Sequence, residues 1–217
     1  MNIQFSFTVN YIILLTTGII TFIEAIRTNA PMIRHIFNLE TCISLVAGYF
    51  YSLFLAKLKE FETQRKKIDW KELSLIRYLD WCITTPMMLI VLCGALAYNI
   101  KKHVHIWTIL AILCLNYVML GVGYLGETET LDKVTAAGTS FVTFFLMYGI
   151  IYYKYIRPKF HLPNYILYGL YFVIWTLYGV VYFFNEETKN FLTNILDLIA
   201  KCFVGIGLWM YYTRIVV

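Results

Sequence analysis

Seven long apolar stretches follow one another along this chain, separated by short polar connections. A helix that crosses the hydrocarbon core of a membrane needs about 20 mostly apolar residues. The first stretch lacks the basic start and small-residue cleavage site of a signal peptide, so we expect it to be retained. The short connections favour antiparallel neighbours in one domain, residues 1–217, an all-α seven-helix transmembrane bundle. The predicted spans are residues 6–26, 32–56, 72–93, 104–125, 131–153, 163–184 and 190–213.

Composition supports the assignment to a membrane. Hydrophobic residues make up 60% and charged residues 14% of the 217 residues, and the mean hydropathy is +0.67. A soluble domain of this composition could not solvate its surface. The net charge of +5 does not indicate a nucleic-acid partner. The five cysteines have no ligand-like spacing, and His103 and His105 alone make a poor metal site, so we expect free thiols and no metal.

The orientation in the membrane is less clear from charge alone. Outside the buried charges described below, Lys and Arg divide eight to eight between the two sides, so the positive-inside rule gives no answer. Many on the amino-terminal side belong to one connection, Lys57–Lys71, where acidic residues alternate with them. The opposite side carries basic residues with no acid beside them. We therefore expect the amino terminus outside and the carboxyl terminus in the cytoplasm.

Four charged residues lie inside the third and seventh spans. Asp80 is about eight residues into the third span and Lys201 about eleven into the seventh, so both should lie near the midplane. Asp197 lies one turn before Lys201, and Arg77 one turn before Asp80. A charge at this depth costs ~2.5–3.5 kcal/mol on insertion scales. The group is either an ion-pair network that locks helices together or a centre for chemistry.

The sequence around these charges is similar to that of a known family. Arg77–Pro86, RYLDWCITTP, resembles the third-helix signature of microbial (type I) rhodopsins, and Asp197–Lys201, DLIAK, resembles the seventh-helix segment to which they attach retinal. Trp175–Tyr178, WTLY, looks like their sixth-helix motif. The resemblance covers the whole chain, including the number of spans. Asn116, Met119 and Gly123 match the fourth-helix spacing that lines the retinal ring pocket in the family.

The resemblance implies a retinal cofactor, all-trans in the dark, bound to Lys201 as a protonated Schiff base. Asp80 and Asp197 would be its counter-ions, because a desolvated imine cation needs nearby anions to offset its charge. Trp81 and Trp175 would form flat walls along the polyene, and Thr84 and Thr85 would supply polar contacts. The remaining residues that the resemblance places around the retinal are Tyr178, Asn116, Met119, Gly123 and Ala200.

Two departures from the pattern of outward proton pumps bear on function. Those pumps carry a carboxylic acid eleven residues after the counter-ion, where this chain has Val91, which cannot donate a proton. The proline that usually follows the sixth-helix tyrosine is replaced by Gly179. The combination of Asp80, Thr84 and Val91 resembles the third-helix triplet of group 1 viral rhodopsins. That resemblance implies a light-gated cation channel.

Polar stripes also favour a channel. Asn10, Thr17 and Glu24 recur every seven residues in the first span, and Glu40 and Ser44 share a face of the second. Asn190 and Asn194 continue the face of Asp197 and Lys201 in the seventh. Such stripes line water or bind helices together by hydrogen bonds. Under the channel hypothesis Glu24 and Glu40 form an inner constriction, Asn190 and Asn194 line the outer half, and Arg77 closes the route.

Other functions stay open at this point. A weak outward proton pump or proton channel could use Glu40 or Glu24 in place of the missing donor. A photosensor ranks last, because no partner-binding extension is apparent. We do not expect an enzyme. The expected partners are the lipid membrane, which would be a host membrane if the protein is viral, and monovalent cations or protons; a homo-oligomer is compatible with the sequence.

Overall fold

The computed structural model describes residues 3–215. In this range it has seven helical spans long and apolar enough to cross a membrane, and no strand, which confirms the predicted fold class. The spans are α1 (Ile3–Arg27), α2 (Pro31–Thr63), α3 (Trp70–Asn99), α4 (Ile106–Glu127), α5 (Lys133–Ile151) with η1 (Tyr152–Ile156), α6 (Leu162–Val181), and α7 (Glu186–Asp197) with η2 (Leu198–Phe203) and α8 (Val204–Tyr212).

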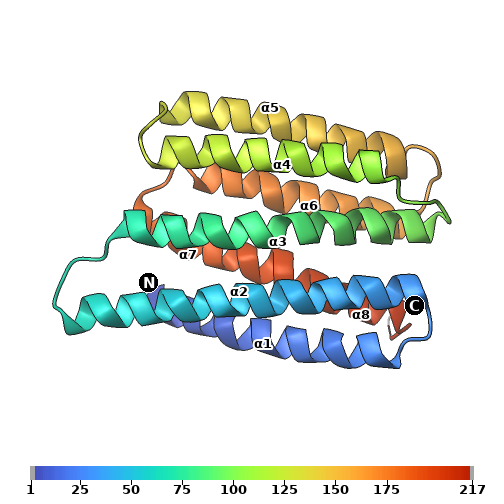
Figure 1. The fold of residues 1–217 in the computed structure, drawn as a ribbon, viewed down its shortest axis with the longest axis horizontal. Helices are drawn as coiled ribbons and strands as arrows, with labels where there is room; N and C mark the ends of the chain where they lie inside the picture. Colours follow the sequence, from blue (N-terminus) through green and yellow to red (C-terminus); the bar gives the residue numbers. More distant parts are fainter. Residues whose placement is uncertain (1–2, 216–217) are drawn as a thin grey trace. The chain divides into compact units, whose positions relative to one another are not determined.

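The helices belong to two compact units. The first unit holds the chain up to Asp80 and again from Val180, so it contains α1, α2, the start of α3, and α7, η2 and α8. The second unit holds Trp81–Gly179, with the rest of α3, α4, α5, η1 and α6. In the first unit α1 lies along α2, and in the second α4 lies along α5 (Figure 1).

The core of the first unit is built from aromatic and aliphatic side chains on α1, α2 and α3. The rings of Phe7, Tyr51 and Phe54 contact one another, with centroids 4.9–5.7 Å apart. Glycines let α1 and α2 approach closely, because a methyl group on Gly18 would lie 3.3 Å from Ser44 Cβ and one on Gly48 3.4 Å from a Leu15 methyl. The spacing of these two helices therefore depends on positions without a side chain.

Helix α2 is longer than its apolar stretch predicts. The sequence placed Lys57–Lys71 in a connection, but α2 continues to Thr63 and α3 begins at Trp70. This prediction was wrong because the extra turns bury Leu58 and Phe61 while their polar face stays in water. Lys57 holds the extension in place, since its amine lies 3.1 Å from Glu60 and 2.8 Å from Glu72 at the start of α3.

Two π-helical segments interrupt the spans, and the sequence predicted neither. One is η1 at the end of α5, and the other is η2, which carries Lys201. A π-turn adds a residue to the helix and rotates the side chains that follow it, and such turns are frequent at functional sites. In η2 it sets the face on which Lys201 projects relative to the residues of α8.

Packing in the second unit explains the glycine that replaces the sixth-helix proline. A methyl group on Gly179 would collide with the ring of Phe141 on α5, so only glycine lets α6 approach this ring. Phe141 is itself stacked on Phe145, with centroids 6.0 Å apart.

At the start of α5 the Thr135 amide and hydroxyl both donate to the Asp132 carboxylate, and these bonds lower the pKa of Asp132.

Candidate functional site

An ion cluster buried in the first unit brings together the charges predicted from the sequence. The Lys201 amine lies 2.6 Å from Asp80 Oδ2 and 3.5 Å from Asp197 Oδ2. The exposed fractions of the three residues are 2%, 0% and 1%. Charges this far from water persist only when they are paired. The two carboxylates therefore face one amine, which has no access to bulk solvent.

Arg77 lies on the amino-terminal side of this cluster along α7. Its guanidinium donates to Asn194 at 2.9 Å and to Asn190 at 3.2 Å, and lies 3.5 Å from Asp197. Two aromatic rings of the first unit cover it, Phe54 at 4.8 Å and Phe7 at 5.6 Å from the guanidinium carbon. Arg77 is thus fixed by hydrogen bonds on one side and cation–π contacts on the other.

Tyr51 of α2 is part of the cluster, although sequence reasoning did not find it. Its hydroxyl lies 2.9 Å from Asp197 Oδ2 and 3.2 Å from Asn194 Oδ1. Phe7 and Phe54 were also missed, as was Ser6, whose hydroxyl accepts from Asn194 at 2.8 Å. In a chain with 18 tyrosines and 16 phenylalanines, nothing in the sequence separates these from packing residues. Only the helix register selects them.

Glu40 of α2 is a further buried acid of the first unit. This carboxylate is 1% exposed, and within the described residues no cation pairs with it. Gly205 makes room for it, because a methyl group there would lie 2.9 Å from Glu40 Oε2 and 3.2 Å from Thr17 Cγ2. The oxygens of Thr17, Ser44 and Asn10 are also buried, and in residues 3–215 Asn10 Oδ1, Thr17 Oγ1 and Ser44 Oγ make no hydrogen bond.

The two predicted inner glutamates have different surroundings. Glu24 is half-buried three residues before the end of α1, whereas Glu40 is deep in the first unit. Beside them, the hydroxyls of Thr21 and Thr41 form a buried hydrogen bond of 2.9 Å between α1 and α2. No hydrogen bond or ion pair in the described range joins Glu24 to Glu40. A single constriction made by both acids therefore stays a prediction.

The second unit contains most of the aromatic and polar residues predicted to surround retinal. Asn116 of α4 donates to the Thr85 hydroxyl of α3 at 2.9 Å. Trp81 and Tyr178 form an edge-to-face pair with centroids 5.4 Å apart, and Trp175 contacts Tyr148 in the same way at 6.0 Å. Tyr148 is a further residue that the sequence did not single out.

The remaining predicted residues are found on the helices expected. Thr84 on α3 and Ala200 on η2 are buried, and Met119 and Gly123 on α4 are partly buried. In residues 3–215 the structure shows no group of three or more His, Cys, Asp or Glu side chains that could hold a metal ion, and all five cysteines are free.

Comparison with known proteins identifies the family. A sequence profile of the Bacteriorhodopsin-like protein family matches residues 1–215. The chain belongs to this family. Viral rhodopsin OLPVRII is 42% identical in sequence to this rhodopsin. Its crystal structure matches with a TM-score of 0.92, and the match covers 100% of each chain. The predicted microbial rhodopsin family and the likeness to a viral rhodopsin are therefore confirmed.

More distant relatives share the fold of this rhodopsin. Bacteriorhodopsin of Halobacterium salinarum is 24% identical over 212 residues, which cover 88% of this chain and 76% of that protein. The proton pumping rhodopsin AR2 from the marine alga Acetabularia acetabulum is 18% identical with a TM-score of 0.79, covering 99% of this chain and 96% of that one. At these identities the likeness shows the fold alone.

The lysine cluster fits the cofactor of this family. Rhodopsins of the family generally bind retinal through a lysine Schiff base. In this rhodopsin Lys201 carries the amine, and the carboxylates of Asp80 and Asp197 offset the positive charge that a protonated imine would keep at the same position. The chain is an integral, multi-pass membrane protein of a family with a light-driven function.

Proposed function

We propose that this rhodopsin is a light-gated cation channel with retinal bound to Lys201 as a protonated Schiff base, all-trans in the dark. Retinal, when bound, supplies absorption of visible light and a change of shape. Asp80 is the nearer counter-ion at 2.6 Å, and Asp197 is the second at 3.5 Å. Tyr51 and Arg77 hold Asp197 in place, so we expect Asp80 to respond first when the charge on Lys201 moves.

The observation that carries the proposal is the buried Glu40 carboxylate in a line of polar groups. We connect two groups into this line: Asn190 and Asn194 of α7 lead to the lysine cluster, and Thr17 and Glu40 both lie beside Gly205, four residues after Lys201. All of these residues lie in the first unit. Once water reaches this line, an ionised Glu40 would attract cations, as acidic rings do in cation channels.

Arg77 supports the view that the line is closed in this state. Its guanidinium is covered by two aromatic rings and bonds two asparagines, so an ion moving past Asn194 would meet a fixed positive charge. Opening would require Arg77 to leave Asn194 or Asp197. Light absorption at the adjacent lysine would supply the displacement, through the shared carboxylate Asp197.

Several parts of the proposal rest on the sequence pattern. Trp81, Trp175 and Tyr178, with Asn116, Met119 and Gly123, would contact the retinal, and Thr84 and Thr85 would lie near the imine. Likeness to the group 1 viral rhodopsins supports cation conduction over pumping, as does Val91 at the position of the usual proton donor. We place the amino terminus outside, the carboxyl terminus in the cytoplasm, and the whole chain in one retinal-binding domain.

Photocurrent measurement under voltage clamp tests the proposal. In a cell expressing the protein with retinal, the light-induced current should reverse sign as the membrane voltage passes the equilibrium potential of the conducted cation. Changing the external cation concentration should shift that reversal voltage. A current that keeps one direction at all voltages and gradients would contradict the channel.

A variant of Glu40 tests the acid itself. Glu40→Gln removes the ability to ionise and keeps the shape, so we expect a cation conductance several-fold lower at unchanged absorption. Glu62→Gln, on the exposed end of the same helix, is the matched control and should leave the current unchanged. Equal currents in the two variants would exclude Glu40 from the conducting route.

The same carboxylate favours a second candidate function, a weak outward proton pump. Glu40 could hold a proton and return it to the imine in place of the donor missing at Val91. In that case Glu40→Gln should slow reprotonation of the imine, measured by flash absorption, and the current should not reverse.

A further inference from the structure

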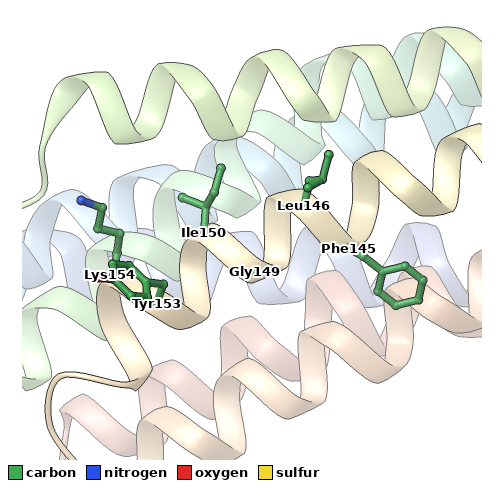
Figure 2. A pocket seen from close by; sticks show the side chains of 6 residues that line it. All are labelled: Phe145, Leu146, Gly149, Ile150, Tyr153 and Lys154. Atoms are coloured by element: carbon green, nitrogen blue, oxygen red, sulfur yellow. The ribbon is translucent and has the colours of Figure 1, made fainter.

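The outer face of η1 and the end of α5 carries a shallow apolar groove in the second unit. Its volume is about 340 Å³. Figure 2 shows its side chains spaced along one helix, with Phe145 at one end, Lys154 at the other, and Gly149 leaving a gap between them. Phe145, Leu146 and Tyr153 are more than half exposed. The lining residues are Phe145, Leu146, Gly149, Ile150, Tyr153 and Lys154.

The groove has the length and position of one lipid tail. Lys154 comes nine positions after Phe145, which corresponds to ~13 Å along a helix. One leaflet of the hydrocarbon core is about 15 Å deep, half of its ~30 Å thickness. Because the fifth span runs from Lys133 to Ile156, we place Lys154 at the membrane surface and Phe145 close to the midplane. A single acyl chain of that leaflet would therefore fill the groove along its length.

The floor of the groove is open because of a glycine. A methyl group placed on Gly149 would have no heavy atom within 4 Å, so nothing in the protein fills this space. Gly138, eleven residues earlier on α5, is equally open but lies outside the groove. A larger side chain at Gly149 would therefore fill the groove, whereas the same side chain at Gly138, on the same helix, would not.

Charge at the surface end of the groove selects the headgroup. Lys101 and Lys102 lie in the connection before α4, Lys154 lies in η1, and Arg157 and Lys159 follow η1. Neither residues 99–107 nor 152–163 contain an acid. Within the described chain none of these side chains forms an ion pair. The Lys102 amine donates to the Lys154 carbonyl at 2.8 Å, which joins the connection before α4 to η1. Unpaired cations at a membrane surface attract anionic lipids.

We propose that this groove binds one anionic phospholipid, with its phosphate at Lys154 and Lys102 and an acyl chain between Leu146, Gly149 and Ile150. The alternative is that a second copy of the chain packs against this apolar helix face. The basic residues argue against it, because a two-fold contact would bring Lys154 of two copies together. The inference requires only that the chain spans a membrane, so it does not depend on the channel proposal.

Native mass spectrometry of the purified full-length protein tests the proposal. The probe is an equal mixture of palmitoyl-oleoyl phosphatidylglycerol and phosphatidylcholine in detergent. We expect one phosphatidylglycerol to be retained at least threefold more often than phosphatidylcholine. Lys154→Gln should remove this preference and leave the phosphatidylcholine adduct unchanged. Lys133→Gln, at the other end of α5, should retain the preference.

Filling the groove tests the acyl-chain part. Gly149→Leu should lower retention of both lipids several-fold, while Gly138→Leu should have no effect. If Gly149→Leu does not fold, as judged by circular dichroism, Lys154→Glu on an exposed side chain should exclude phosphatidylglycerol instead. Equal retention of the two lipids by the unmodified protein would overturn the proposal. Equal lipid retention by Gly149→Leu and Gly138→Leu would also overturn it. So would the finding that the protein is a dimer and that Gly149→Leu dissociates it.

Discussion

Lys201 and the carboxylates of Asp80 and Asp197 show how far single residues in the sequence predict the charged centre of this protein. A lysine and two aspartates inside apolar stretches are expensive to bury, so their presence in the sequence indicated a shared centre, which the structure contains. The partners that fix this centre were not predictable in the same way. Tyr51, Phe7 and Phe54 are common residues in a membrane protein, and they become part of the centre only through distances of 2.9–5.6 Å between helices.

The attachment point can be tested at one residue. Lys201→Ala removes the amine that would hold retinal, so we expect complete loss of visible absorption after reconstitution. Lys189→Ala, on the same span and paired with Glu186 at 2.7 Å, should keep the colour. The absorption spectrum of each purified variant gives the answer, and colour in Lys201→Ala would disprove attachment at this residue.

The nearer counter-ion should control the colour more than the farther one. Asp80→Asn removes the negative charge 2.6 Å from the Lys201 amine, and the ground state loses more stabilisation than the excited state. We expect a shift of the absorption maximum to longer wavelength. Asp197→Asn should give a smaller shift, because Asp197 is 3.5 Å away and shares its charge with Arg77 and Tyr51. An unchanged spectrum in Asp80→Asn would mean that Asp197 alone balances the imine.

At the scale of the helix, hydrophobic runs located every span but not its ends or its interruptions. The charged end of α2 was assigned to a connection because Lys and Glu break an apolar run, although they also form stable helix surfaces. The π-turn of η2 leaves no signal in composition. It matters because it sets the rotation of Lys201 relative to Gly205, four residues later and opposite Glu40.

Gly205 provides a test at this scale. In Gly205→Ala the added methyl group would lie 2.9 Å from Glu40 Oε2, so the carboxylate or α8 must shift. Overpacking of this kind costs about 1–3 kcal/mol of unfolding free energy. We expect lower thermal stability and a photocurrent reduced in the same direction as in Glu40→Gln.

Gly207→Ala is the matched control for that variant. It lies on the same helix, and a methyl group there has no heavy atom within 4 Å. Its stability and photocurrent should equal those of the unmodified protein. If Gly205→Ala has the same stability and photocurrent as this control, the close approach of Gly205 to Glu40 does not affect function.

For the whole molecule, the orientation in the membrane is the prediction with the broadest consequences. Lys101, Lys102, Lys154, Arg157 and Lys159 lie on the side opposite the amino terminus and have no acid beside them, which favours the cytoplasm for that side. An epitope tag on the amino terminus should therefore bind antibody on intact cells. A tag on the carboxyl terminus should bind only after permeabilisation. The reverse pattern would mean that the channel has the opposite orientation in the membrane and that the groove binds a lipid of the opposite leaflet.

The sequence by itself determined that this is a membrane protein with seven spans and a charged centre on the third and seventh. Both follow from the cost of placing polar groups in hydrocarbon, which each residue carries wherever its neighbours lie. The tertiary structure alone decided which side chains complete that centre and that Gly205 makes room for Glu40. It also decided that Gly149 opens a groove beside Lys154. These depend on how each helix is rotated and how far it is shifted along its neighbours, and packing between helices sets both.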